Sequence, residues 1–135
     1  MSFEKLIEEL QQKTAEALAM GGAEKLAKRK AEGRLNARER IDCLVDPGSF
    51  IESGRYARSH RPEVKAKTPA DGKIAGFARI AGREVGLVSN DFTVLGASSS
   101  VIMQPLRVAS PFTLIELKYT KRFTKARAAC AARFD

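Results

Sequence analysis

Apolar residues at the start of the chain recur three and four positions apart, so they share one helical face: Phe3, Leu6, Ile7, Leu10, Thr14, Ala17 and Leu18. Ser2 stands where a helix N-cap is expected, and Glu4 places a negative charge in the first turn, where it suits the helix dipole. The pattern predicts an amphipathic helix that runs to about Met20. Residues 23–32 favour helix by propensity but carry little apolar surface, which predicts a second, exposed helix.

A third helix is indicated by its own start signal. Asn36 is followed three residues later by Glu39, which is the spacing of a capping box. The apolar residues that follow are expected to face the core: Ile41, Leu44 and Val45. We expect Cys43 to be buried among them, and Arg38 to pair with Asp42 one helical turn away.

Alternating residues in the middle of the chain predict a β-hairpin. Ile74, Gly76, Ala78 and Ile80 alternate along one strand, and residues 84–90 form the returning strand. Ala81 and Gly82 form the connection. Because alanine does not suit the positive φ of a type I′ turn, we expect a type I turn in which Gly82 alone has positive φ. Small residues on both faces predict that the hairpin is covered on both sides.

The remaining segments are less regular. Residues 53–72 carry five basic residues against two acidic ones and few large apolar groups, which predicts a long basic loop of a kind that is often functional. Residues 103–135 form a basic tail, in which a helical-looking segment has its cations on one face: Lys118, Lys121, Arg122 and Lys125. We therefore divide the chain into a helical segment (1–52), the basic loop (53–72), the hairpin region (73–102) and the tail (103–135).

The net charge suggests an alternative function. The 135 residues have a net charge of +8, which favours a nucleic acid or an anionic surface as partner. Most of that excess lies beyond residue 100. The alternative function is therefore a small basic module that binds nucleic acid or a membrane surface through residues 113–135.

Other classes of protein are disfavoured. No apolar run approaches the roughly 20 residues of a membrane span. His60 is the only histidine and the two cysteines lie far apart, so we expect no Cys/His zinc site and no other metal. No secretory signal is recognised at the start, which leads us to expect a cytoplasmic protein.

Two blocks of sequence resemble a known family. Residues 33–41 read GRLNARERI and residues 46–50 read DPGSF; residues 71–83 read DGKIAGFARIAGR and residues 89–98 read SNDFTVLGAS. In this order and spacing they resemble the carboxyltransferase (β) subunit of biotin-dependent acyl-CoA carboxylases of the propionyl-, acetyl- and methylcrotonyl-CoA type. The resemblance covers about residues 21–102.

The resemblance implies an α/β chain with a crotonase-like fold of ββα units, in which N-terminal helices precede the first hairpin. It implies transfer of a carboxyl group from carboxybiotin to the α-carbon of an acyl-CoA. The carboxybiotin would be supplied by a biotin carboxylase or biotin carrier subunit, no cofactor would be bound covalently, and the subunits would form homo-oligomers. On this basis no nucleic-acid or membrane partner is expected.

The resemblance also points to site residues. Gly96, Ala97 and Ser98 occupy the loop after the second strand, where the family places an oxyanion donor and contacts to CoA. A plain tight turn is the alternative. Arg55, Arg58 and Arg61 of the basic loop could contact CoA phosphates, although a solvated loop is the interpretation that we favour from sequence.

The family pattern is not recognised beyond residue 102. We therefore expect the N-terminal portion of a longer subunit, with a divergent and irregular or helical tail and no complete set of catalytic residues. Negligible carboxyltransferase activity is expected from these 135 residues alone. A third interpretation is an interaction piece that docks on full-length subunits through its three helices.

Overall fold

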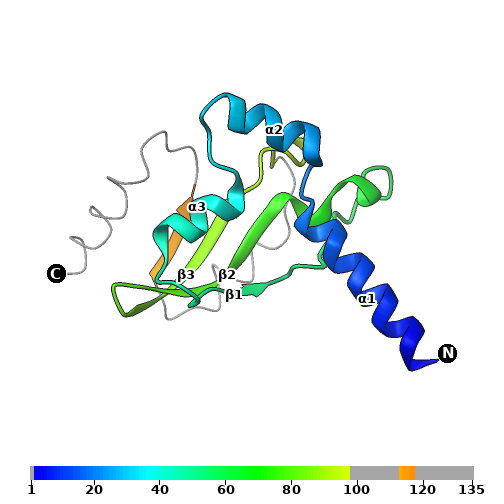
Figure 1. Cartoon of the computed structure of the whole chain (residues 1–135), viewed down its shortest axis with the longest axis horizontal. Helices are drawn as coiled ribbons and strands as arrows, with labels where there is room; N and C mark the ends of the chain where they lie inside the picture. Colours follow the sequence, from blue (N-terminus) through cyan, green and yellow to red (C-terminus); the bar gives the residue numbers. More distant parts are fainter. Residues whose placement is uncertain (1, 98–112, 118–135) are drawn as a thin grey trace.

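Three helices precede a four-stranded sheet in the computed structural model, which describes residues 2–97 and 113–117 (Figure 1). The helices are α1 (Phe3–Leu18), α2 (Ala23–Ala31) and α3 (Ala37–Leu44). The strands are β1 (Ile51–Ser53), β2 (Lys73–Ile80), β3 (Arg83–Asn90) and β4 (Thr113–Leu117), in the order β1-β2-β3-β4. The first three strands are antiparallel neighbours, and β4 runs parallel to β3. The predicted mixed α/β class is confirmed.

Helix α3 begins at the predicted capping box. The Asn36 side chain accepts from the backbone N–H groups of Arg38 and Glu39, and a Glu39 carboxylate oxygen accepts from the Asn36 N–H at 2.8 Å. The helix then lays its apolar side on β2 and β3. The core of the molecule lies at this contact, among Ile41, Leu44, Val45, Ile74, Ile80, Val85 and Leu87.

Two expectations about α3 are wrong. Cys43 is exposed, because the buried side of the helix is formed by Ala37, Arg40, Ile41 and Leu44. Arg38 pairs with Glu52 of β1, not with Asp42. Packing of α3 on the sheet brings Glu52 within reach of the Arg38 guanidinium. Arg38 therefore pairs with the more buried Glu52, while Asp42 on the same helix is exposed.

The hairpin is confirmed, but its turn is of another type. Ala81 has φ 51° and Gly82 has φ 77°, so both central residues are left-handed, as in a type I′ turn. The carboxylate of Asp46 accepts from the N–H groups of Ala81 at 3.1 Å and Gly82 at 2.8 Å. This contact from Asp46, in the loop between α3 and β1, holds Ala81 in a backbone conformation that alanine disfavours.

Helix α1 has the predicted pattern and start, but it ends at Leu18 and its apolar side is open. Among the described contacts, the helix packs mainly on the turn Pro69–Gly72, and Ala17 is its one buried residue. Ser2 has the extended backbone of an N-cap without a side-chain capping bond. The large apolar side chains are 40–74% exposed: Phe3, Leu6, Ile7, Leu10 and Leu18. Helix α2 is exposed as expected.

The tail differs from expectation where it is described. Residues 113–117 are strand β4 beside β3, and not part of an irregular or helical tail. A short apolar run such as this one is compatible with a helix or with a strand. Pairing with the edge of β3 stabilises the strand. The remaining tail residues, including Lys118 to Lys125, lie outside the described part, so the basic module stays a prediction. No helix in the described ranges is long and apolar enough to cross a membrane.

Candidate functional site

A large cavity lies where three described segments meet: the junction of α1 and α2, the basic loop, and the loop that follows β3. We call it the basic groove. It is open and has a volume of about 930 Å³. Among the described residues, the lining includes one carboxylate, that of Glu16, and four cations: Lys25, Arg58, Lys65 and Lys67.

The groove gathers only part of the predicted phosphate-binding set. Arg58 lines both the groove and a smaller neighbouring cavity of about 460 Å³. Arg55 lines that smaller cavity and another cavity beside β1, but not the groove. Arg61 lines neither, and its guanidinium pairs with the exposed Glu63 at 2.8 Å. His60 is exposed at the rim of the smaller cavity. The structure therefore singles out Arg58 among the three predicted arginines.

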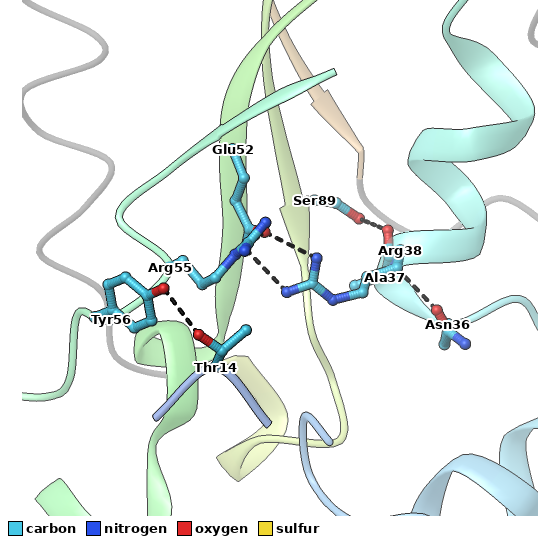
Figure 2. Close-up of polar contacts among 8 residues, drawn as sticks. All are labelled: Thr14, Asn36, Ala37, Arg38, Glu52, Arg55, Tyr56 and Ser89. Atoms are coloured by element: carbon cyan, nitrogen blue, oxygen red, sulfur yellow. Dashed lines mark hydrogen bonds and ion pairs between the residues drawn. The ribbon is translucent and has the colours of Figure 1, made fainter. Parts of the chain in front are cut away.

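Arg58 is held by contacts from two sides. One terminal nitrogen contacts the carboxylate of Glu16 on α1, and the other donates to the backbone oxygen of Ala66 at 3.2 Å. A hydrogen bond of 2.9 Å between Thr14 and Tyr56 links the same helix to the same loop (Figure 2). These polar contacts fix one wall of the groove.

Thr93 fixes the opposite wall. Its hydroxyl accepts from the N–H of Gly21 at 3.0 Å, and its backbone oxygen accepts from Lys25 Nζ at 3.1 Å. The carboxylate of Asp91 accepts from the Thr93 N–H at 3.0 Å and from its hydroxyl at 2.5 Å. A Cβ atom on Gly21 would lie 2.2 Å from the Thr93 oxygen, so this close approach requires glycine.

The predicted loop Gly96–Ser98 begins beside this wall. Leu95, Gly96 and Ala97 form a left-handed turn with φ of 44°, 63° and 57°. Left-handed backbone is costly for residues other than glycine, by about 1–2 kcal/mol each, and such strain is concentrated at functional sites. Leu95 lines the groove, while Ser98 lies outside the described residues.

The backbone of the turn bears on its predicted role. The Ala97 N–H donates to the Val94 oxygen at 2.8 Å, so in this conformation that N–H is already engaged. A second left-handed turn, Ala70 to Gly72, packs against the first, with the Gly72 oxygen accepting from the Asp91 N–H at 2.9 Å. The assignment of Gly96 and Ala97 as oxyanion or CoA contacts stays a prediction.

Glu52 anchors the start of the basic loop. Figure 2 shows its side chain between the guanidinium groups of Arg38 and Arg55. The carboxylate accepts from Arg38 at 2.9 and 3.0 Å and from Arg55 Nε at 2.7 Å, and only 4% of the side chain is exposed. Burial alone would raise the pKa of Glu52, but the hydrogen bonds and charges of Arg38 and Arg55 outweigh it and lower that pKa. The hydrogen bond to Glu52 in turn raises the pKa of Arg55.

Sequence reasoning missed two groove residues. Glu16 and Lys25 lie on the first two helices, far along the chain from the basic loop, and their helical patterns suggest only solvated positions. No local signal marks them, because their role arises when the helices pack against the loop and β3. Within the described ranges, no cluster of three His, Cys, Asp or Glu residues could hold a metal ion.

Residues 28–106 match the model of the carboxyl transferase domain. The chain is 40% identical over 102 residues to the carboxyltransferase subunit of propionyl-CoA carboxylase from Haloferax mediterranei, covering 73% of this chain and 20% of that protein. It is 39% identical over 102 residues to the methylmalonyl-CoA carboxyltransferase 12S subunit of Propionibacterium freudenreichii, covering 73% and 19%.

A solved structure has the same fold over most of the chain. The crystal structure of transcarboxylase 12S, described as a hexamer and with hydrolysed methylmalonyl-coenzyme A bound, aligns with a TM-score of 0.70 at 32% identity. The alignment covers 84% of this chain and 25% of that one, and the shared fold is crotonase-like. The chain spans about a fifth of the length of the curated relatives it matches. By sequence and by fold, the chain belongs to the carboxyl transferase domain family.

Proposed function

We propose that this chain forms part of a carboxyltransferase site that acts on an acyl-CoA, and that the basic groove holds the phosphates of the CoA. The observation that carries this proposal is the meeting of Arg58 and Lys25 with the turn that follows β3 in one groove. Family membership supports the proposed class of reaction. The groove supports the proposed role of this chain, which is to bind the phosphates of CoA.

The chemistry of the groove suits CoA. Its volume of about 930 Å³ lies within the range of ligand sites, and its lining by described residues holds four cations and one carboxylate. CoA carries a phosphate monoester and a pyrophosphate on one flexible molecule. Arginine binds phosphate oxygens through two parallel hydrogen bonds, and lysine contributes a compact positive charge. A polyanion can therefore contact several groove cations at once.

The proposed reaction moves a carboxyl group from carboxybiotin, supplied by a biotin carboxylase or biotin carrier partner. The α-carbon of the acyl-CoA loses a proton and gains the carboxyl group, while the biotin nitrogen loses the carboxyl group and gains a proton. Negative charge develops on the thioester oxygen, which positioned N–H donors stabilise. We assign the predicted loop residues Gly96, Ala97 and Ser98 to this end of the site; Gly96 follows Leu95, which lines the groove.

We also propose that the parent protein is a homo-oligomer. The apolar side of α1 is exposed in the single chain, and the similar transcarboxylase 12S is described as a hexamer. Large exposed apolar patches mark interaction surfaces. Light scattering coupled to size-exclusion chromatography would measure the mass of the assembly, and a strictly monomeric protein would contradict this part of the proposal.

Calorimetric titration of the full chain with CoA tests the groove. Arg58→Gln should weaken CoA binding about tenfold, because one bidentate phosphate contact is lost. Arg61→Gln is the matched control, since Arg61 belongs to the same loop and has its own glutamate partner but does not line the groove. It should change the affinity less than about twofold.

Two results would overturn the proposal. One is equal weakening by Arg58→Gln and Arg61→Gln, which would indicate a diffuse charge effect. The other is equal affinity for CoA and for pantetheine, which lacks all of the phosphates. A fall in affinity with rising salt for CoA but not for pantetheine should accompany the expected result.

A further inference from the structure

Glu16 is the one carboxylate among the described residues that line the basic groove, and it contacts Arg58 directly. Its other oxygen accepts from Gln12 of the same helix at 3.4 Å. The anion that Arg58 binds in this structure is therefore a residue of α1. One terminal nitrogen of Arg58 donates to Glu16 and the other to the Ala66 oxygen, so a phosphate that takes both nitrogens must displace these acceptors or share the nitrogens with them.

We propose that Glu16 is a built-in competitor for the anion site at Arg58, so that phosphate binding in the groove is coupled to loosening of α1. The inference rests on the proposed function only in requiring that phosphate binds at Arg58. It concerns how the site is regulated and does not depend on which acyl group is carried.

The competition favours phosphate over the resident carboxylate. Glu16 and Arg58 have side chains that are 45% and 26% exposed, and exposed ion pairs contribute little to stability. A phosphate monoester carries a charge of about −1.5 to −2 and three acceptor oxygens, whereas a carboxylate carries one charge. Phosphate is therefore the stronger competitor for the Arg58 guanidinium.

Displacement has a structural consequence because α1 is held by few contacts. Ala17 is its only buried residue, and its polar links to the basic loop are Glu16–Arg58 and Thr14–Tyr56. Loss of the first removes one of these two links between helix and loop. Coupling between two sites is reciprocal, so whatever releases Glu16 must also strengthen phosphate binding.

The test compares Glu16→Gln with two matched variants of the full chain, using inorganic pyrophosphate and CoA as separate probes. Glu16→Gln should tighten binding of pyrophosphate by about two- to fivefold, the range that an exposed ion pair allows. Glu9→Gln removes the same charge from the same helix but pairs with Lys13 away from the groove, so it should leave the affinity unchanged.

Hydrogen exchange of the α1 amides provides the second measurement. Saturating pyrophosphate should speed exchange in the wild-type helix, and Glu16→Gln should abolish that dependence. Tyr56→Phe removes the other link and should speed exchange without tightening pyrophosphate binding. The inference would be overturned if Glu16→Gln left pyrophosphate binding unchanged or weaker. It would also be overturned if pyrophosphate did not change the exchange rate of the wild-type helix.

The two probes separate this inference from the proposed function. If pyrophosphate behaves as expected but CoA does not bind, then the competitor role stands and the acyl-CoA assignment fails. If CoA binds through Arg58 and Glu16→Gln changes neither affinity nor exchange, then the acyl-CoA assignment stands and the competitor role fails.

Discussion

Glu52 joins three segments through a single carboxylate, linking α3 and the basic loop to β1 by way of Arg38 and Arg55. Removing one partner of a buried ion pair is costly, because it leaves charge without compensation. Both arginines are only partly buried, which reduces that cost. The importance of Glu52 therefore lies in holding the start of the basic loop against the sheet.

Glu52→Gln should lower the free energy of unfolding by about 1–3 kcal/mol, measured by urea denaturation at pH 7. Glu63→Gln removes the same charge from an exposed pair with Arg61 and should change stability by less than about 0.5 kcal/mol. Equal effects of the two substitutions would contradict the structural role of Glu52.

The same carboxylate predicts a pH dependence. The pKa of Glu52 is lowered from its ordinary 4.5 in the folded state, so its contribution is fully present above about pH 4.5 and is lost as pH falls through the folded pKa. The stability difference between wild type and Glu52→Gln should therefore be constant from pH 7 to pH 5 and shrink below pH 4.5. Local hydrogen bonds also lower the pKa of Glu4, Glu9 and Glu63, but these residues are present in both proteins and cancel. A difference that grows on acidification would contradict the assignment.

Single residues show why local sequence can mislead. Arg38 and Asp42 have the spacing of a helical ion pair, and the arginine nevertheless turns to Glu52, fourteen positions along the chain. Cys43 lies beside core residues in sequence but on the outer side of the helix. Asn36 was predicted correctly, because a capping box is complete within four residues.

Among the elements, the β2–β3 hairpin carries strain at one position. Ala81 is left-handed in a two-residue turn, where asparagine followed by glycine is the preferred pair. Ala81→Asn should raise stability by about 1 kcal/mol and the melting temperature by a few degrees, measured by circular dichroism. Ala81→Val should lower both, because a β-branched residue resists positive φ. Equal effects of the two substitutions would contradict the turn type.

Element type was easier to predict than element surroundings. The apolar spacing of α1 identifies a helix, but it cannot show that the apolar side lies open in the single chain. Residues 113–117 were placed in a helical-looking tail, and the edge of β3 pairs them as a strand. In both cases the deciding contact lies outside the segment itself.

For the whole molecule, the sequence motifs identified the family but did not predict the groove. Two ordered blocks indicated the carboxyltransferase family, and the match to the family model and the shared fold confirm that membership. The groove depends on Glu16, Arg58 and Thr93, which are separated along the chain by 42 and then 35 positions and meet only through packing. Arg58 was one of three arginines that sequence could not rank, and Lys25 was not recognised.

These 135 residues should bind CoA but should not carboxylate an acyl-CoA. Because it spans about a fifth of its curated relatives, we expect carboxylation of an acyl-CoA in the presence of carboxybiotin to be negligible for these 135 residues alone. Incorporation of labelled carboxyl groups into acyl-CoA would measure it. Turnover above that of a sample without protein would contradict the prediction.

The central claim is that the basic groove binds the phosphates of CoA, and amide chemical-shift mapping tests it most directly. Titration of the labelled chain with CoA should shift the amides that line the groove, among them Gly21, Lys25 and Leu95, while the Ala81–Gly82 turn stays unchanged. Pantetheine at the same concentration should leave the amides of Lys25 and Lys65 unchanged. Shifts confined to the hairpin turn, or groove shifts of equal size with pantetheine, would contradict the account.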